Sequence, residues 1–591
     1  MSLIVQKFGG TSVGDVEKIQ SAARKAVRAR QEGHQVVVVV SAMGKNTDEL
    51  IRLASEVTDS PPAREMDMLL STGEQVSVAL MAMAVTSLGY EAVSLTGAQI
   101  GIRTDSTHTK ARIHSISTER IRAALSAGKI VIAAGFQGID EDFNITTLGR
   151  GGSDTTAVAL AAVLGAEECQ IYTDVDGVYT TDPRILPEAR MVRQVSYVEM
   201  LELASMGAGV MHSRSIEFGK KFNVAIHVRN AAADIPGSLI VDAPESNTRP
   251  VSGAAGVRDE ARVSVRGVPD EPGTSHAIFS RIAAKNVPVD MIVQNVGERG
   301  LVDVSFTVLL ADLPATLEAV QKASDKLDAD EFTFDRKVSK VSVVGLGMAK
   351  QTGVAPRMFR ALAESGSNIQ MITTSDIKIS TLVSREDHMK ALRAAHAAFE
   401  LHVPPDDADP NPVPPPVRRG DAVDVVERLR GMEDLTIDGI ACEDSQSRVT
   451  IAKVPDVPGT AARIFERIAA ADVFVDMIVQ SCGGDEHLAD LSFTIPQDQL
   501  EICLAALDAA SKELGSGIVS HAPWVSKLTV SGIGMRNHTS VAIRMFEALA
   551  NSGINLEMVN SSEVSVNIVV DGERGQEGMK RLQDAFADAR Q

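Results

Sequence analysis

The sequence predicts an α/β domain with a mostly parallel open sheet, followed by four α+β units of βαββαβ type in two tandem copies. Two observations support this prediction. From residue 1 to about 245, short apolar runs alternate with amphipathic helical stretches, as in parallel sheets. From residue 258 onward, one segment of the chain occurs twice. At 591 residues the chain is also too long for a single hydrophobic core.

The elements of the front half follow in order. Residues 3–8 are expected to form the first strand. Asp15 is expected to cap a helix with Val16, Ile19, Ala23 and Val27 on one face, ended by Gly33. Five valines at residues 36–40 indicate a strand buried on both faces, and residues 130–134 and 169–173 form similar runs. Helices between such strands should cover both faces of the sheet.

The back half repeats itself after 186 or 187 residues. The text Val-Pro-Asp-x-Pro-Gly-Thr occurs at 268–274 and again at 454–460, and Asp-Met-Ile-Val-Gln occurs at 290–294 and at 476–480. We expect a front domain at 1–245 and small split βαβ units at 258–335, 336–400, 444–522 and 523–591. Seven prolines between residues 404 and 416 predict an extended surface spacer within a linker and lead-in at 401–443.

Composition limits the classes of function. Asp and Glu number 78 against 58 Lys and Arg, and a net charge of −20 repels nucleic acid and anionic membranes. The four cysteines lack the close spacing of a metal knuckle. Neither a bilayer-spanning apolar run nor a signal pattern is recognised. We therefore expect a cytoplasmic protein that binds neither nucleic acid nor membrane.

A lysine and two glycines follow the first expected strand. Gly9 and Gly10 would let the backbone approach a polyphosphate, and Lys7 would add the positive charge that a phosphoryl group needs. Taken alone, such a segment is usually only a turn.

A second glycine-rich segment covers residues 148–156. Gly151 and Gly152 precede Ser153 and Asp154 at the start of an alanine-rich helix, where free amides attract anions. Arg150 could hold a carboxylate through two hydrogen bonds. The alternative is an ordinary capped loop.

Polar residues also follow the strand at 169–173. Asp174 and Asp176 stand where ligands bind in open α/β sheets, and Arg184 could contact a phosphate. A calcium loop is rejected, because the terminal glutamate and flanking helices are missing. Residues 71–74 are expected to form a small loop that offers Glu74 before a helix; by itself, Glu74 would be a cap.

Together with residues 39–44 and 135–138, these motifs resemble the aspartate kinase family, which has the amino-acid kinase fold. The duplicated half resembles ACT domains, which bind small amino acids. The likeness covers essentially the whole chain, and four such units are typical of the cyanobacterial type.

The resemblance implies transfer of the ATP γ-phosphoryl group to the β-carboxylate of L-aspartate, toward lysine, threonine and methionine. Mg²⁺ would arrive with ATP, without protein ligands of its own. The implied catalytic residues are Lys7, Arg150 and Asp154. The implied ATP-binding residues are Lys7, Phe8, Gly9, Gly10, Thr173, Asp174, Tyr179, Arg184 and Gly209. The implied aspartate-binding residues are Ser41, Thr47, Glu74, Arg150, Gly151, Gly152 and Ser153.

One departure concerns Gly209, where many relatives have a lysine. A side-chain contact to ATP is lost there, and only a backbone role is left. The chemistry itself needs no general base, since a carboxylate with a pKa near ~4 is ionised at pH 7. Positioning and charge neutralisation should therefore dominate catalysis.

The likeness to ACT domains also implies inhibition by lysine, threonine or both. The implied effector-binding residues are Asp270, Pro272, Gly273, Gln294 and Asn295 in the first copy, and Asp456, Gly459 and Gln480 in the second. The alternative is that these loops only shape turns. Binding between units or subunits would make the enzyme an oligomer, most simply a homodimer.

Rival interpretations stay open. The protein could be an amino-acid sensor with an inert kinase domain, or another kinase of the same fold, such as a glutamate or uridylate kinase. Intact Lys7, Glu74, Arg150 and Asp154 argue against the first, and the ACT-like repeats argue against the second. A fusion with homoserine dehydrogenase is not expected.

Overall fold

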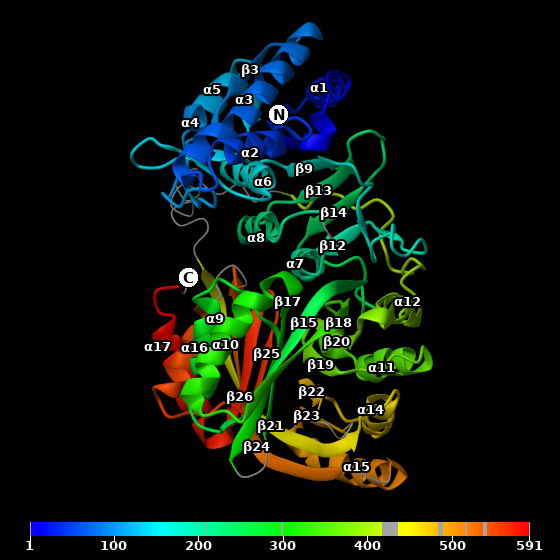
Figure 1. The fold of residues 1–591 in the computed structure, drawn as a ribbon. Coiled ribbons are helices and arrows are strands. Elements are labelled where there is room, and N and C mark those ends of the chain that lie inside the picture. Colours follow the sequence, from blue (N-terminus) through cyan, green and yellow to red (C-terminus); the bar gives the residue numbers. More distant parts are fainter. Residues whose placement is uncertain are drawn as a thin grey trace.

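The computed structural model describes residues 2–207, 210–296, 300–416, 435–482, 488–514, 517–535 and 540–589. Figure 1 shows the front half at one end of the molecule and the four back-half units at the other, with the helix α7 at the junction.

The front half is built on a sheet of eight strands in the order β12-β14-β13-β9-β1-β2-β6-β3. Every neighbouring pair is parallel except β13 with β14. The predicted strands at 3–8, 36–40, 130–134 and 169–173 are confirmed. The strands are β1 Leu3–Phe8, β2 Gln35–Val40, β3 Ala92–Leu95, β6 Ile130–Ala134, β9 Glu168–Thr173, β12 Gln194–Ser196, β13 Ile226–Asn230 and β14 Ser238–Val241.

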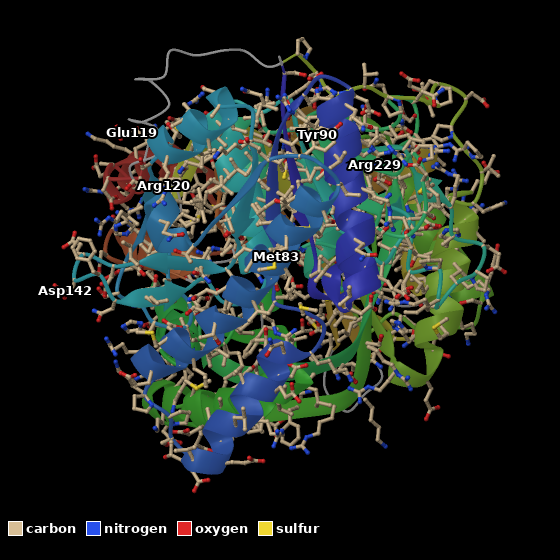
Figure 2. All side chains as sticks on the ribbon, turned by 90° about the horizontal axis from the view of Figure 1, so that it is seen from above. Met83, Tyr90, Glu119, Arg120, Asp142 and Arg229 are labelled. Carbon is tan, nitrogen blue, oxygen red and sulfur yellow. The ribbon has the colours of Figure 1, made fainter. Side chains whose placement is uncertain are left out.

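Helices cover both faces of this sheet, as predicted. On one face lie α1 (Val16–Gln31) and α3 (Ala63–Ser87), whose inner side chains pack on β2 and β6; in Figure 2 these two helices lie side by side, with Met83 labelled on α3. On the other face lie α5 (Glu119–Ser126), α6 (Gly152–Leu164), α7 (Tyr197–Ser205) and α8 (Ser213–Phe222). Asp15 caps α1 as predicted, but Val16 is 64% exposed and does not belong to the buried face.

Smaller elements complete the front half. The strands β4 (Ile102–Thr104), β5 (Ile113–Ile116), β7 (Gln137–Ile139) and β8 (Ile145–Thr147) form a side sheet. A short hairpin joins β10 (Val178–Tyr179) to β11 (Met191–Val192). The helices α2 (Asn46–Val57) and α4 (Gly97–Ile100) follow β2 and β3.

The expected loop at residues 71–74 is wrong, because these residues lie inside α3. Within this helix, Gly73 serves a close contact. A Cβ on Gly73 would lie 2.8 Å from the Ala42 Cβ atom, so glycine lets α3 approach the segment after β2. Glu74 therefore projects from the middle of a rigid helix.

By length and composition α3 could also cross a membrane, contrary to the sequence analysis. However, Val78, Met81 and Val85 pack into the core on one side of the helix, and Asp67 and Glu74 are buried as well. A core helix of a globular domain passes the same test, and α3 is packed as one.

The back half forms one continuous sheet of twelve strands in the order β16-β17-β15-β18-β20-β19-β22-β23-β21-β24-β26-β25. The strands of the first copy are β15 Gly253–Pro269, β16 Asp290–Val296, β17 Leu301–Leu309, β18 Glu331–Val344, β19 Met371–Ser375 and β20 Lys378–Ser384. Those of the second are β21 Thr436–Pro455, β22 Ile478–Cys482, β23 Leu488–Pro496, β24 Ile518–Ile533, β25 Met558–Ser561 and β26 Ser565–Asp571. The helices are α9 Thr274–Ala283, α10 Leu313–Leu327, α11 Val354–Glu364, α12 His388–Ala398, α14 Thr460–Ala470, α15 Leu500–Leu514, α16 Ser540–Ala550 and α17 Gly575–Ala585.

Long strands link the units within each copy. Residues 260–266 of β15 pair with 331–338 of β18 in the first unit, whereas 253–257 pair with 340–344 in the second. β21 and β24 repeat this arrangement. The first part of β15 therefore belongs to the second unit and the rest of this strand to the first unit. In the same way, β21 is shared between the fourth and the third units. The expected boundaries at 258 and 444 fall inside β15 and β21, because each of these long strands pairs with partners in two units.

Units from different copies also pack together. Figure 1 shows α9 of the first unit beside α16 of the fourth, and α11 of the second unit near α14 of the third. The apolar cores are shared accordingly: one joins the first and fourth units, and another the second and third. The back half therefore has an internal pseudo-twofold arrangement.

The start of the proline-rich segment lies against residues 246–249, which connect the front half to β15. Asp407 accepts hydrogen bonds from Ser246 and Thr248, and Arg249 donates to the carbonyls of Val403 and Pro404. The expected linker at 401–443 stays a prediction for its middle part, since 417–434 lie outside the described residues.

Candidate active site

The predicted site residues gather at the carboxyl ends of the central parallel strands. Lys7 lies near the end of β1, Ser41 follows β2, Gly135 follows β6 and Thr173 ends β9. Open α/β sheets bind ligands at this edge, because loops from neighbouring strands meet there.

Lys7 and Asp154 form an ion pair at the centre of this edge. The Lys7 Nζ atom lies 2.5 Å from Asp154 Oδ1, and both side chains are largely buried. A Cβ on Gly9 would lie only 3.5 Å from the same Nζ atom, so the ammonium group stands over the glycine turn. Asp154 therefore orients Lys7 toward the backbone that was predicted to receive phosphates.

The start of α6 points at the same place. Gly151 precedes the helix with φ = +69°, and a Cβ there would meet His212 at 2.3 Å, so only glycine fits. A Cβ on Gly135 would lie 2.7 Å from Ser153 Oγ, which places Ser153 against the end of β6. Arg150 is exposed just before this helix start.

Glu74 reaches the site from α3. Its Oε1 atom accepts the Ala42 N–H at 3.0 Å, whereas Oε2 is buried and has no hydrogen-bond donor within the described part of the chain. Burial raises the pKa of Glu74 to about 7, partly offset by the backbone hydrogen bond from Ala42. A buried, unsatisfied carboxylate oxygen of this kind is suited to a ligand ammonium group.

A second cluster lies along β9 and β10. Phe8 stacks on Tyr172 with ring centroids 4.7 Å apart. Thr173 Oγ1 donates to the exposed Asp174 at 3.2 Å, and the Tyr179 hydroxyl lies 3.5 Å from Asp176. Gly9 N–H lies 3.4 Å from the Tyr172 carbonyl, which joins this cluster to the glycine turn.

Three predicted residues lie at the margin of the site or outside the description. Arg184 is exposed and donates to Asp182 at 2.7 Å, so its guanidinium is already paired. Thr47 is half-buried in the first turn of α2. Gly209 lies outside the described residues.

The predicted effector residues lie at the junctions between units. Asn555 of the fourth unit donates to Asp270 at 2.7 Å, and Gln294 donates to the Leu556 carbonyl at 2.8 Å. At the other junction, Asn368 donates to Asp456 at 2.8 Å and Gln480 to the Ile369 carbonyl at 2.9 Å.

The second of these junctions, at Asp456, leaves little room for a ligand. Gly273 and Gly459 adopt left-handed φ values of +105° and +95° at the starts of α9 and α14, and Pro272 is exposed. The side chain of Asn295 lies outside the description. The cavity between Asp456 and Gln480 measures about 10 Å³, which is space for one water molecule.

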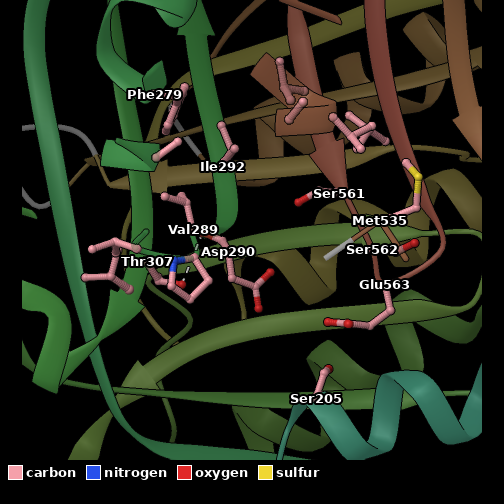
Figure 3. A pocket seen from close by; sticks show the side chains of 18 of the residues that line it. Ser205, Phe279, Val289, Asp290, Ile292, Thr307, Met535, Ser561, Ser562 and Glu563 are labelled. Carbon is pink, nitrogen blue, oxygen red and sulfur yellow. Dashed lines mark hydrogen bonds between the residues drawn. The ribbon is translucent and has the colours of Figure 1, made fainter. Parts of the chain in front are cut away.

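A larger cavity that the sequence analysis missed lies between the first and fourth units. It measures about 150 Å³. Figure 3 shows Asp290 and Glu563 reaching toward the same space from different units, with Phe279, Ile292 and Met535 around it. Lys340 also lines the cavity and pairs with Asp290 and with Glu260.

A twin of this cavity lies between the second and third units and measures about 300 Å³. Asp476 and Lys527 occupy the places of Asp290 and Lys340 and are 2.5 Å apart, and Asp376 replaces Glu563. The signal was present in the sequence, since both copies repeat an acidic and a basic residue within apolar strands.

Among the described residues, only the first of these cavities is lined by the front half. Ser205 of α7 lines it, and Glu202 of the same helix pairs with Lys378 at 2.9 Å. Glu202 also accepts the backbone N–H of Glu563 at 2.8 Å. Glu202 has no exposed surface, so a buried contact joins α7 to the cavity wall.

Known families match both halves. The amino acid kinase family matches residues 2–230, and the ACT domain matches 341–399, 450–510 and 528–586. An aspartokinase of Pseudomonas aeruginosa is 52% identical over 407 residues, which are 68% of this chain and 99% of that protein. The chain belongs to the aspartate kinase family. It is therefore a kinase, built on the amino-acid kinase fold with C-terminal ACT domains.

Other members extend this comparison. Aspartokinase 2 of Bacillus subtilis is 50% identical over 402 residues, again 68% of this chain. The crystal structure of aspartate kinase from Synechocystis covers all of this chain and 98% of its own, with 38% identity and a TM-score of 0.53. An E. coli aspartokinase III structure in complex with aspartate and ADP shares the fold over 67% of this chain, at 23% identity and a TM-score of 0.57.

Proposed function

We propose that this protein transfers the γ-phosphoryl group of ATP to the β-carboxylate of L-aspartate and forms 4-phospho-L-aspartate. The observation that carries the proposal is the convergence of Lys7, Asp154, Glu74 and the start of α6 at one sheet edge. The kinship with aspartokinases supports the choice of substrate.

Charge neutralisation is the main task of the site. The reaction brings an anionic carboxylate to an anionic phosphate, and it needs no base. Lys7 would bind the transferring phosphoryl group, held in place by Asp154. Amides of Gly9 and Gly10 would receive the phosphate chain, and Mg²⁺ bound to the nucleotide would neutralise further charge.

Aspartate would bind between α3 and the start of α6. The free oxygen of Glu74 suits the substrate ammonium group, and Arg150 with Ser153 suits a carboxylate. The nucleotide would lie on the β9–β10 side, near Thr173, Asp174 and Tyr179, with Arg184 at the rim. Phe8, Ser41, Thr47, Gly151 and Gly152 would shape the walls.

We propose that amino-acid effectors bind between ACT units. The cavity with Asp290 and Glu563 combines carboxylates with apolar walls, which suits lysine, whose ammonium group would compete with Lys340 for Asp290. The junctions at Asp270 and Asp456 would have to open first, because their polar groups already satisfy one another. We also propose a cytoplasmic homodimer that binds neither membrane nor nucleic acid.

The test of the reaction is product trapping. Purified protein with ATP and Mg²⁺ should form an acyl phosphate from L-aspartate, captured as a hydroxamate by hydroxylamine. L-Glutamate and UMP should give none. A hydroxamate formed from glutamate, or phosphorylation of UMP, would assign another activity of the same fold.

The role of Lys7 is tested by Lys7→Ala, and the sensor alternative by the activity of the wild type. Removing one positioned charge should lower kcat by about 10²–10³-fold while circular dichroism stays unchanged. Near-normal turnover of the folded variant would remove Lys7 from the mechanism, and an inactive wild type that still binds lysine would make the protein a sensor.

A further inference from the structure

Asp67 is a buried carboxylate that the proposed chemistry leaves unused. It lies on the inner side of α3 and has no exposed surface. The Thr109 N–H lies 3.0 Å from both carboxylate oxygens, the Thr147 hydroxyl donates at 2.5 Å, and His108 Nδ1 lies 2.8 Å from Oδ2. A buried carboxylate costs free energy unless hydrogen-bond donors replace the water that it loses. These donors therefore hold the Asp67 side chain in one place.

Asp67 joins two segments beside the proposed aspartate site. Thr147 ends β8 and directly precedes residues 148–153, the loop that carries Arg150 and Ser153. Thr109 belongs to a loop that lies against this segment. The Ala111 N–H donates to the Thr147 carbonyl at 2.9 Å, and a Cβ on Gly149 would lie 3.0 Å from the Thr109 carbonyl oxygen. Both segments are therefore fixed to α3 through one carboxylate.

The same helix carries Glu74. Asp67 and Glu74 are seven residues apart, about two helical turns, and both are buried on the same side of α3. In the proposed complex, Glu74 binds the ammonium end of aspartate and residues 148–153 bind a carboxylate. The separation of these two groups depends on how residues 148–153 are attached to α3.

We propose that Asp67 is a positioning residue that sets the affinity for the amino-acid substrate by holding residues 148–153 at a fixed place relative to Glu74. This inference rests on the proposed function. Asp67 would not touch the substrate; it would act through Thr147 and Thr109. Small displacements of binding groups are costly, because the bound geometry must match the transition state.

The nucleotide should be much less affected. Lys7 and Thr173 belong to β1 and β9, whereas α3 packs mainly on β6, β3 and β8 farther along the sheet. Asp154, which pairs with Lys7, follows the segment 148–153 but is held within α6. Loss of Asp67 should thus raise the KM for aspartate and leave the KM for ATP unchanged. A merely structural role would lower the fraction of active enzyme, and with it the apparent kcat, without this split.

The experiment compares Asp67→Asn and Thr147→Val with the wild type in the full-length protein. We expect the KM for aspartate to rise about tenfold or more in Asp67→Asn, with the KM for ATP within about twofold. Thr147→Val removes one donor and should change the same constant by a smaller factor. The double variant should fall short of the product of the two factors, because both changes break one network.

The control is Glu168→Gln. Glu168 is also buried and pairs with a histidine, His227, at 3.0 Å, but it lies at the opposite, amino end of β9. Its variant should keep both KM values. If Asp67→Asn fails to fold, Thr147→Val carries the test.

An unchanged KM for aspartate in a folded variant, or equal rises in both KM values, would overturn the inference. A wild type without aspartate-dependent turnover would refute the proposed function instead, so the two failures can be told apart.

Discussion

At the scale of single residues, the environment of Glu74 links substrate binding to pH. Burial raises its pKa to about 7, so the free enzyme carries it protonated below that pH. A bound ammonium group would favour the ionised form and release a proton. Lys7 and Asp154 show the opposite arrangement, since each satisfies the charge of the other.

We predict that affinity for aspartate falls as the pH drops from 8 to 6. Only ionised Glu74 attracts the substrate ammonium group, and about tenfold in Kd is expected for one pH unit below the pKa. Calorimetry in buffers of different ionisation enthalpy should detect proton release near pH 7. A pH-independent Kd would remove Glu74 from the ammonium site.

Glu74→Gln should weaken aspartate binding but stabilise the fold at high pH. The pKa of Glu74 is higher in the folded state, about 7, than in the unfolded state, 4.5. Relative to low pH, the wild-type fold is therefore destabilised as the pH rises from 4.5 through about 7, because a proton must leave a buried carboxyl group. At pH 8 the variant should therefore unfold with on the order of 2–3 kcal/mol more free energy than the wild type. The difference should vanish near pH 4, as urea titrations can check.

At the scale of elements, the strands were predictable from local pattern and the contacts between elements were not. The valine run at 36–40 gives β2 directly, because only a strand covered on both faces needs it. The loop expected at 71–74 lies inside α3, where Gly73 serves a close contact with Ala42 that no local pattern shows. The partners of β15 and of Asp290 lie far away in the chain; the repeat marks Asp290 and Lys340 as recurring charges, but no local pattern shows that they pair.

Gly73→Ala tests the close contact of α3. Alanine favours a helix by about 1 kcal/mol over glycine, yet its Cβ would lie 2.8 Å from the Ala42 Cβ. We expect the helix to shift, Glu74 to move and the KM for aspartate to rise several-fold. The exposed neighbour Thr72→Ala is the control and should leave kinetics unchanged. Wild-type kinetics for Gly73→Ala would show that α3 need not approach so closely.

At the scale of the whole molecule, the two halves meet asymmetrically. The two cavities between ACT units are lined by matching charged residues, but among the described residues only the one with Asp290 touches α7. Burial lowers the pKa of Lys378, and the nearby carboxylates of Glu202, Asp290 and Glu563 outweigh it, so the net pKa is raised and Lys378 stays charged. A ligand that attracts Glu563 would thus disturb the support of α7.

Glu202→Gln should uncouple inhibition from binding. The neutral side chain keeps its shape but loses the ion pair with Lys378, so inhibition by lysine should weaken while uninhibited turnover stays. Glu443→Gln, which alters a contact of Lys527 at the other cavity, is the matched control. Equal loss of inhibition in both variants would contradict a one-sided coupling.

The decisive measurement is the release of ADP from ATP and Mg²⁺, with and without L-aspartate, and then with lysine, threonine or both. We expect ADP release that depends on aspartate and is suppressed by lysine or threonine. ADP release that is indifferent to aspartate, or none at all while lysine still binds, would refute an aspartate kinase controlled by amino acids.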